Sequence, residues 1–377
     1  MKTVMISAGE ASGDAHAANL VRALRELNPD IRVKGMGSKK LLAAGCDILV
    51  NCDDIGVVGI WEVIKKYRAI KRALNRMQAE LVQSPPDLLI LVDYQEFNFR
   101  LAAKAKALGV KVLFYISPQV WAWRPGRVHS MGEKIDHMAV LFPFEEKFYR
   151  DADVPCTFVG HPLVDEVKPN KSRAQCFNDF GLNANGAVVG IFPGSRKNEI
   201  KKNLPVQLKA ASILKTQRPE IQFILPIAST IDESDLQPFL ATSKHLSVLT
   251  VRDRPYNVIQ CCDAIVTASG TATLEIALMG VPNTIVYRVA PLSYWIIKRL
   301  MTINDIGLVN IILGKNVVKE FLQGEANPAA IAKEIKRLLE DEDYRRQMIT
   351  SLNQVRNELG KAGGSRHVAE LASSMMS

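Results

Sequence analysis

The chain has 377 residues, of which 47% are hydrophobic and 23% charged, a balance typical of a folded protein with room for two cores. Lys and Arg exceed Asp and Glu by 48 to 39, which favours anionic partners such as phosphates, nucleic acid or acidic lipids. No apolar stretch approaches the ~20 residues of a membrane-spanning helix, and neither a CxxC pair nor a nucleic-acid-binding motif is present, so we expect a soluble or peripheral protein of a reducing cytoplasm.

Short aliphatic runs alternate with longer helical patterns, which predicts an α/β protein built from βα units with parallel sheets. In the first half the expected strands are Thr3–Ala8, Ile31–Met36, Leu88–Val92, Lys111–Ile116, His137–Leu141 and Thr157–Val159. Helical patterns such as Ala15–Leu27 and Trp61–Leu81 fall between them. In the second half the expected strands are Ala187–Phe192, Gln222–Pro226, Ser247–Val251, Ala264–Thr267 and Thr284–Tyr287.

This order of elements predicts two Rossmann-like domains. We expect the first at residues 1–165, a crossover linker at 166–185, the second at 186–345, and a helical tail at 346–377. The tail could pack on the first domain or on a partner subunit. In such folds ligands bind at the carboxyl ends of the strands, so the cleft between the domains is the expected site.

The first strand ends in a glycine-rich loop that runs from Gly9 to Asp14. Its glycines allow a tight turn, and Glu10, Ser12 and Asp14 can hydrogen-bond a sugar or cap the following helix. For Ser12 and Asp14 taken alone, capping is the simpler interpretation. The pattern GxGxxG is absent, which argues against a nicotinamide cofactor.

The helical segment from Trp61 to Arg76 combines a basic face with an apolar one. It predicts contact with an anionic membrane, although a helix packed on the core with solvated cations explains the pattern equally well. A mixed patch at Tyr294–Leu300 adds to the membrane interpretation. The candidate contact residues in the helix are Trp61, Ile64, Lys65, Lys66, Arg68, Lys71 and Arg72.

Asp93 directly follows the apolar run Leu88–Val92, where a buried strand emerges. An acceptor alcohol is a poor nucleophile until its proton is removed as it attacks, so a carboxylate at this position is a candidate general base. Glu96 and Glu10 could perform the same task. A carboxylate at a strand end is otherwise a turn or cap residue.

The next strand leads through Pro118 to Trp121 and Trp123. Pro118 enforces a non-helical junction, and the indoles can form an amphipathic wall for a sugar, an acyl chain or a lipid headgroup. Core packing of either indole is the alternative.

In the second half a buried strand leads into Pro193–Arg196. Gly194 permits close approach of the backbone, free N–H groups beside Ser195 can meet phosphate oxygens, and Arg196 adds a guanidinium fork. A simple strand-to-helix turn with a surface arginine is the alternative.

A second loop of this kind carries Ser269, Gly270 and Thr271 at the start of a helix, with Glu275 about one turn further on. The helix N-terminus can bind a phosphate oxygen, and Glu275 can accept hydrogen bonds from ribose hydroxyls. An ordinary cap and a solvated glutamate are the alternative. Together the two loops favour a nucleoside diphosphate, and the absence of GxxxxGK[ST] leaves no reason to propose ATP or GTP hydrolysis.

These residues predict a glycosyltransferase that uses a nucleotide-activated sugar. A UDP-sugar 2-epimerase with a similar two-domain cleft and a non-catalytic membrane-surface protein that binds acylated sugar phosphates are the other hypotheses. The sequence shows no convincing metal cluster, and we expect neither a metal nor a cofactor, because fixed donors can stabilise the leaving group.

The chain resembles the lipid-A-disaccharide synthase family at motifs that occur in the expected order over nearly its whole length. This resemblance implies a GT-B fold and transfer of 2,3-diacylglucosamine from its UDP-linked form to 2,3-diacylglucosamine 1-phosphate, giving a β-1,6-linked disaccharide 1-phosphate and UDP. The motifs are GEASGD, VDYQEFN, SPQVWAWR, PGSR, SGTATLE and GLVNIILGKNVVKEFLQ.

By this resemblance Asp93 corresponds to the family's catalytic carboxylate and Arg196 to its key basic residue, while Glu96 stands where a second Asp is often found. The expected reaction is one inverting displacement in which Asp93 takes the proton of the acceptor's 6-hydroxyl. The resemblance also implies a cytoplasmic protein, peripheral on the inner membrane of Gram-negative bacteria, and a homodimer with exchanged C-terminal segments. Residues matching the nucleotide side are Ser195, Ser269, Gly270, Thr271, Glu275 and Asn310, and those matching the acceptor side are Glu10, Ser12 and Asp14.

Overall fold

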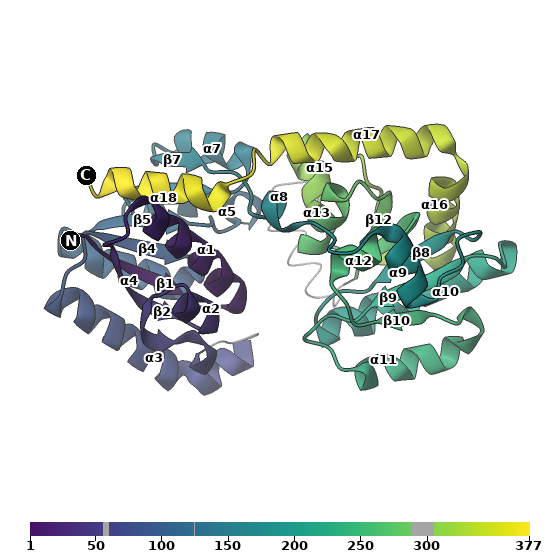
Figure 1. Ribbon diagram of the computed structural model, residues 1–377, viewed down its shortest axis with the longest axis horizontal. Coiled ribbons are helices and arrows are strands. Elements are labelled where there is room, and N and C mark those ends of the chain that lie inside the picture. The colour runs from purple at the N-terminus through teal and green to yellow at the C-terminus, as the bar shows by residue number, and fades with distance from the viewer. Residues whose placement is uncertain (56–59, 124, 289–304) are drawn as a thin grey trace. The chain divides into compact units, whose positions relative to one another are not determined.

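The computed structural model describes residues 1–55, 60–123, 125–288 and 305–377, apart from a few side chains at the edges of these ranges. It divides into two compact units, each with its own parallel sheet (Figure 1). The first unit comprises Met1–Pro162 together with Leu359–Ser377, and the second comprises Leu163–Glu358. The chain therefore returns to the first unit at its C-terminal end.

The first unit is built on a seven-stranded sheet in the order β3-β2-β1-β4-β5-β6-β7. Every paired strand runs parallel, and β4 is buried along its whole length, as expected for a strand covered on both faces. The strands are β1 (Thr3–Ala8), β2 (Arg32–Gly37), β3 (Asp47–Asn51), β4 (Leu88–Val92), β5 (Lys111–Tyr115), β6 (His137–Val140) and β7 (Cys156–Phe158).

Helices on the first unit bury their apolar sides against this sheet. The last helix, α18, lies beside α1 (yellow and dark purple in Figure 1), and Lys111 in β5 donates to the carbonyl of Met375 at 2.6 Å. The helices are α1 (Ala11–Leu27), α2 (Lys39–Ala43), η1 (Cys52–Asp54), α3 (Ile60–Gln83), α4 (Gln95–Ala107), α5 (Val120–Trp123), α6 (Arg127–Gly132), α7 (Pro143–Arg150) and α18 (Gly364–Met375).

The second unit contains a six-stranded parallel sheet in the order β10-β9-β8-β11-β12-β13. Strands β8 and β11 at its centre are completely buried, and apolar residues around them form the core of this unit. The strands are β8 (Val188–Phe192), β9 (Gln222–Pro226), β10 (Leu249–Val251), β11 (Ala264–Ala268), β12 (Asn283–Tyr287) and β13 (Glu320–Leu322).

The second unit begins with α8 at Leu163, before the segment expected to be a linker, and its helices extend beyond the expected domain end. Residues 166–185 contain α9, and the expected boundary between 345 and 346 falls inside α17. The helices are α8 (Leu163–Glu166), α9 (Arg173–Phe180), α10 (Lys197–Gln217), α11 (Glu233–Leu240), η2 (Ala241–Leu246), α12 (Pro255–Ile259), α13 (Thr271–Leu278), α15 (Leu308–Leu313), η3 (Gln323–Glu325), α16 (Pro328–Glu340) and α17 (Glu342–Glu358).

Both sheets have the strand order of a Rossmann fold. In each, the chain starts at an interior strand, β1 or β8, adds two strands on one side, and then continues on the other side with β4 or β11. The point where the direction changes leaves a crevice at the carboxyl ends of those two strands, which is where such sheets bind ligands. The two candidate sites therefore lie at the β1/β4 and β8/β11 ends.

Candidate active site

The loops that follow β1 and β4 touch each other in the first unit. The strands are paired in register, and the ring of Tyr94 lies directly on Gly9. A Cβ at Gly9 would come within 2.2 Å of that ring, so the contact requires glycine. The loops that carry Glu10 and Asp93, both predicted on the acceptor side, are thus brought together.

Asp93 is held firmly by its backbone in a left-handed conformation with φ 49°. Its N–H donates to the Tyr115 carbonyl at 3.1 Å, and its carbonyl accepts the side-chain amide of Asn98 at 2.7 Å. Asn98 is fully buried and also accepts the Ser7 hydroxyl at 2.6 Å, which ties β1 to β4. Burial raises the pKa of the Asp93 carboxyl above its ordinary value, which makes it a stronger proton acceptor than an exposed aspartate.

A pocket of about 480 Å³ opens beside Asp93. Neither Glu10 nor Glu96 lines it, and Glu96 is exposed and accepts a hydrogen bond from the Arg127 guanidinium at 2.7 Å. Among the three candidate bases, Asp93 is the half-buried one that lines the pocket, whereas Glu10 and Glu96 are exposed. The lining residues are Asp93, Gln95, Ile116, Ser117, Pro118, Gln119, Val120 and Arg127.

Asp14, predicted on the acceptor side, has a structural role in the first unit. Only 3% of the residue is exposed. Its carboxylate accepts hydrogen bonds from three backbone N–H groups at the start of α2, those of Ser38, Lys40 and Leu41. Capping was the simpler interpretation of its motif, but the helix that Asp14 caps is α2 and not α1. Ser12 is exposed on the first turn of α1.

A buried polar cluster that the sequence did not reveal lies behind the pocket wall. Trp121 donates through its indole N–H to Glu145 Oε1 at 3.0 Å, and Glu145 Oε2 accepts two backbone N–H groups at the start of α7. The hydroxyls of Ser117 and Tyr149 are 2.7 Å apart. The cluster fixes the chain between β5 and α5, part of which lines the pocket.

Trp121 is therefore a core residue in this structure, which is one of the two interpretations open from the sequence. It is 8% exposed, and its ring packs edge-on against Phe144 with 4.8 Å between centroids. Its indole is not available for the predicted contact with a membrane or acyl chain. The side chain of Trp123, predicted for the same role, lies outside the described residues.

Glu145 gives the folding stability a specific pH dependence. Burial raises the pKa of the Glu145 carboxyl to about 7, whereas its pKa in the unfolded chain is ~4.3. The stabilisation from the protonated carboxyl is therefore complete below pH ~4.3 and is lost as the pH rises through 7. Between pH 5 and 7.5 we expect the wild type to lose about 2 kcal/mol more unfolding free energy than Glu145→Gln. Urea denaturation at both pH values measures the difference. Exposed Glu133→Gln is the control and should track the wild type; parallel losses in wild type and Glu145→Gln would contradict this.

In the second unit the two predicted phosphate loops follow neighbouring strands. Phe192 at the end of β8 pairs with Thr267 near the end of β11. Gly194 has φ 114°, a conformation that favours glycine, and lets the chain turn into α10. The Pro193–Arg196 loop and the loop at Ser269 thus lie at one sheet edge.

The Pro193–Arg196 loop already holds an anionic group in this structure. The backbone N–H groups of Ser195 and Arg196 donate to Glu199 Oε2 at 3.0 and 3.2 Å, and the Arg196 guanidinium meets Glu199 Oε1 at 3.0 Å. The donors expected to hold phosphate oxygens therefore converge on one carboxylate. The Arg196 side chain is 70% exposed, so it can reach a ligand.

The second phosphate loop leads from β11 into α13 through Ser269, Gly270 and Thr271. No atom of the described residues would lie within 4 Å of a Cβ at Gly270, so these residues leave the space over the loop open. Glu275 is half-buried one turn into α13 and accepts the Tyr256 hydroxyl at 3.0 Å, and burial raises its pKa. Tyr256 could be identified only from the structure, because it is distant in sequence.

Asn310, which the resemblance assigns to the nucleotide side, forms a complete internal hydrogen-bond set. Its amide donates to the Val318 carbonyl and Glu320 Oε1, both at 2.8 Å. Its oxygen accepts the N–H groups of Val317 and Val318, both at 2.9 Å. Asn310 therefore shapes the loop before β13, and a contact with UDP would require one of these bonds to break.

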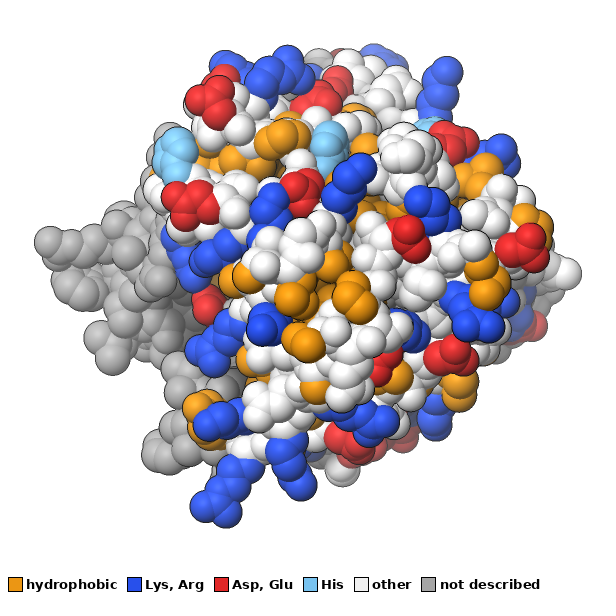
Figure 2. Space-filling model, turned by 90° about the vertical axis from the view of Figure 1, so that its left-hand side faces the viewer, with side chains coloured by type: hydrophobic (Ala, Val, Ile, Leu, Met, Phe, Trp, Pro, Cys, Tyr) orange, Lys and Arg blue, Asp and Glu red, His pale blue; other side chains and the backbone are white. Residues whose placement is uncertain are grey.

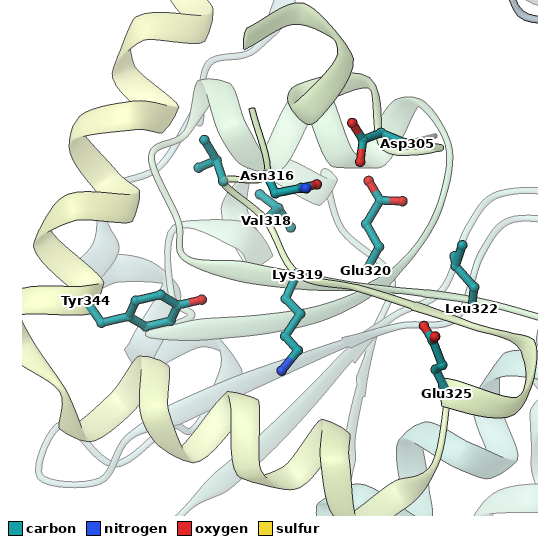
Figure 3. A pocket seen from close by; sticks show the side chains of 9 residues that line it. Asp305, Asn316, Val318, Lys319, Glu320, Leu322, Glu325 and Tyr344 are labelled. Carbon is teal, nitrogen blue, oxygen red and sulfur yellow. The ribbon is translucent and has the colours of Figure 1, made fainter. Parts of the chain in front are cut away.

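Glu320 connects this loop to the second phosphate loop. It accepts the N–H groups of Ile306 and Gly307 at 3.0 and 2.9 Å, and the Ser269 hydroxyl donates to the Ile306 carbonyl at 3.2 Å. Glu320 also lines a pocket of about 410 Å³, where its carboxylate faces that of Asp305 (Figure 3). None of the predicted nucleotide-binding residues lines this pocket, so it lies outside the candidate site.

The family model for lipid-A-disaccharide synthetase matches residues 4–373 of this chain. A lipid-A-disaccharide synthase of Geobacter sulfurreducens is 49% identical over 373 residues, which cover 99% of this chain and 97% of that protein. The enzyme of the same name from Nitrosococcus oceani is 47% identical, with 99% of this chain and 96% of that protein covered.

Solved structures support the expected GT-B fold. A UDP-GlcNAc 2-epimerase from Neisseria meningitidis, bound to UDP-GlcNAc, has a TM-score of 0.65 at 12% identity, and Acinetobacter baumannii MurG has 0.59 at 15%. Both alignments cover 99% of this chain and 100% of the other. At such identities the similarity to the solved structures concerns the fold alone, whereas the family match and the relatives at 47–49% identity establish the family of this chain. The chain therefore belongs to the lipid-A-disaccharide synthetase family, a family of glycosyltransferases of lipid A biosynthesis.

Proposed function

We propose that this chain transfers 2,3-diacylglucosamine from its UDP-linked form to 2,3-diacylglucosamine 1-phosphate, giving a β-1,6-linked disaccharide 1-phosphate and UDP. The observation that carries the proposal is the different chemistry of the two sites where the strand order reverses, at the β1/β4 and β8/β11 ends. In the first unit a half-buried carboxylate, Asp93, lines a pocket, whereas in the second unit backbone N–H groups converge on an anion beside Arg196. Family membership supports the identity of the two sugars.

The proposed reaction is a single displacement that inverts the anomeric centre of the donor. Asp93 accepts the proton of the acceptor's 6-hydroxyl as that oxygen bonds to the anomeric carbon. The bond from the anomeric carbon to the phosphate oxygen breaks at the same time. The Arg196 guanidinium and the N-termini of α10 and α13 stabilise the charge of the departing UDP.

The remaining nucleotide-side residues have supporting roles in this proposal. Gly194 and Gly270 let the diphosphate approach the backbone, and Thr271 stands at the N-terminus of α13. Glu275 accepts hydrogen bonds from the ribose, with the Tyr256 hydroxyl holding its carboxylate in place. No bound metal is required, because these donors are fixed before UDP leaves.

A UDP-sugar 2-epimerase is not favoured, because the solved epimerase shares only the fold at 12% identity, whereas lipid-A-disaccharide synthases reach 49%. A direct assay separates the hypotheses. Purified protein is incubated with the UDP-diacyl sugar and the acceptor, and with each omitted in turn. Mass spectrometry should detect a tetraacyl disaccharide 1-phosphate only when both are present. An altered sugar formed without acceptor would indicate an epimerase, and lipid binding without UDP release would indicate a non-catalytic binding protein.

We also propose that α3 brings the protein to an anionic membrane surface. Its outer face exposes Arg68, Lys71 and Arg72, and Tyr67 is 55% exposed among them. Lys and Arg side chains are numerous along the lower margin of the face in Figure 2. Basic residues at a surface are each worth about 1 kcal/mol of attraction to anionic lipid. Within the described parts of the chain, no helix is long and apolar enough to cross a membrane.

The apolar side of α3 does not contribute to that surface as far as it is described. Ile70 and Leu74 pack against the core of the first unit, which leaves the cations rather than an apolar stripe to make contact. The side chains of Trp61, Ile64 and Lys65, and the whole of the patch at 294–300, lie outside the described residues. Lys66, also predicted to contact the membrane, is only partly exposed.

Charge reversal on α3 tests the membrane proposal. Lys71→Glu/Arg72→Glu should weaken binding to vesicles rich in phosphatidylglycerol by at least about 30-fold, because two attractive charges become repulsive. Vesicle sedimentation measures the change. The matched control, Lys333→Glu/Lys336→Glu on α16, changes the net charge equally and should bind as the wild type does. Equal weakening in both variants would mean that net charge alone, and not α3, governs binding.

The proposed homodimer would exchange α18 between two copies. This helix buries Val368, Ala369 and Ala372 and packs against α1 of its own chain. A second copy presents an identical α1 surface, so the same contacts can form between chains. Analytical ultracentrifugation distinguishes a dimer from a monomer, and Ala369→Asp, which places a charge in this contact, should release α18 in either case.

A further inference from the structure

We infer that Arg127 binds the phosphate of the acceptor and makes the enzyme selective for a phosphorylated sugar. This inference rests on the proposed function and adds to it, because neither the motifs nor the family resemblance gave a residue to the acceptor's anionic group. The argument starts from the pocket beside Asp93, whose lining includes two charged side chains, Asp93 and Arg127.

The two charged side chains suit two groups of the acceptor, its 6-hydroxyl and its anomeric phosphate. In a hexopyranose 1-phosphate the anomeric phosphate and the hydroxymethyl group that carries the 6-hydroxyl are attached to the two carbons that flank the ring oxygen, so one pocket can contact both groups. Asp93 provides the base for the hydroxyl, and Arg127 provides a cation for the phosphate in the same pocket. The volume of about 480 Å³ falls in the range of ~300–1,000 Å³ typical of small-molecule sites. Gln95 and Gln119 add neutral amide groups to the lining.

Arg127 is oriented before any ligand arrives. It stands in the first turn of α6, and its Nη2 donates to Glu96 Oε1 at 2.7 Å. Among the described residues this is the one side-chain partner of the guanidinium, so its other N–H groups are available for phosphate oxygens. Its side chain is 41% exposed, and a planar guanidinium can bind two phosphate oxygens at once.

The hydrogen bond to Arg127 also indicates a role for Glu96. Its carboxylate is 71% exposed and does not line the pocket, which makes it a poor general base. By holding one edge of Arg127 it limits the rotamers of a long side chain, which reduces the entropy lost on binding phosphate. Glu96 is thus a positioning residue for Arg127.

Acceptor selectivity tests the inference. Initial rates are measured with short-chain diacylglucosamine 1-phosphate and with the same sugar lacking the phosphate. Hydrogen bonds to a charged group contribute ~1.5–3 kcal/mol, so Arg127→Gln should raise the KM for the phosphorylated acceptor about 10- to 100-fold with kcat changed less than about threefold. kcat/KM for the unphosphorylated sugar should stay within about threefold. Arg127→Lys, which keeps the charge but loses the fork, should lie between.

Arg150→Gln is the matched control, because Arg150 is an exposed arginine of the same unit that pairs with Glu146 at 3.3 Å. It should keep the wild-type preference. The inference is overturned if Arg127→Gln keeps that preference, if it lowers the rates with both acceptors equally, or if the wild type has no preference at all. A wild type that forms no disaccharide from either acceptor would instead disprove the proposed function. Thermal melting of each variant checks that it is folded, and Arg127→Lys supplies the test if Arg127→Gln is not.

Discussion

Replacing Asp93 with asparagine is expected to lower the rate of disaccharide formation by about 10²- to 10⁴-fold, the range that a positioned general base contributes. The neutral amide cannot accept the proton of the attacking hydroxyl. Affinity for UDP should stay within about twofold, because the proposed diphosphate donors, at Ser195 and Arg196, belong to the other unit. Initial rates at saturating substrate and calorimetric titration with UDP measure the two quantities.

Asparagine is the informative replacement because of the backbone at this position. Asp93 has φ 49°, a left-handed conformation that Asn and Asp adopt more readily than other residues with a side chain. The bonds that hold it, to Tyr115 and Asn98, use main-chain atoms of Asp93 that asparagine retains. The variant should therefore melt within a few degrees of the wild type, whereas alanine would add strain and obscure the result.

The pH profile supplies an independent test of the same assignment. A base acts only when deprotonated, so kcat/KM of the wild type should fall as the pH is lowered through the Asp93 pKa, which burial raises above its ordinary value. Asp93→Asn should lack that acidic limb. Asp151→Asn removes an exposed carboxylate of the same unit and should behave as the wild type. Near-normal turnover in Asp93→Asn, with loss in Glu10→Gln instead, would transfer the role of base to Glu10.

The positions of the candidate loops could be predicted because each one follows a strand that is buried on both faces. Leu88–Val92 and Val188–Phe192 are apolar runs in the sequence and completely buried in the structure. Asp93 and Pro193 come next, so the end of the apolar run marks the edge of the sheet. Once the chain is known to alternate strands and helices, the Rossmann order brings the ends of β1 and β4 together in the first unit and those of β8 and β11 together in the second.

Two of the four edge strands, β3 and β13, could not be predicted in the same way. The strands β3 (Asp47–Asn51) and β13 (Glu320–Leu322) are not among those predicted from the sequence. The first has only half-buried residues between exposed ends, and the second is three residues long, so their apolar runs are only three and two residues long. Their pairing is decided by the neighbouring strands, β2 and β12, and not by a local pattern.

Contacts between distant residues are the other part that sequence alone could not supply. Trp121 and Glu145 are 24 residues apart, and Glu96 and Arg127 are 31 apart. Nothing in either local pattern indicates a partner, because the contact depends on where α5, α6 and α7 lie over the sheet. The indole of Trp121 was therefore open to two interpretations until its buried hydrogen bond was seen.

Replacing Arg196 with alanine should lower kcat/KM for the UDP-sugar by about 10²- to 10³-fold, the effect of removing one fixed donor that stabilises developing charge. The guanidinium is 70% exposed beside two backbone N–H groups that already hold a carboxylate, so it is placed to bind an anion there. Steady-state kinetics with varied donor measure the effect. Arg196→Lys should recover part of the activity, since it restores the charge without the bidentate fork.

Two further variants test whether the fall in kcat/KM of Arg196→Ala comes from loss of the guanidinium itself or from another change in local charge. Lys197→Ala removes the adjacent cation, which pairs with Asp235 at 2.9 Å, and should change kcat/KM less than about threefold. An equal loss in that variant would mean that local charge, and not Arg196 itself, matters. A different explanation of the fall in kcat/KM is electrostatic repulsion by Glu199. Its carboxylate loses its ion-pair partner in Arg196→Ala and would repel the diphosphate. If that repulsion were responsible, Arg196→Ala/Glu199→Gln would regain nearly all activity. Because the guanidinium is proposed to stabilise departing UDP directly, the double variant should stay within about threefold of Arg196→Ala.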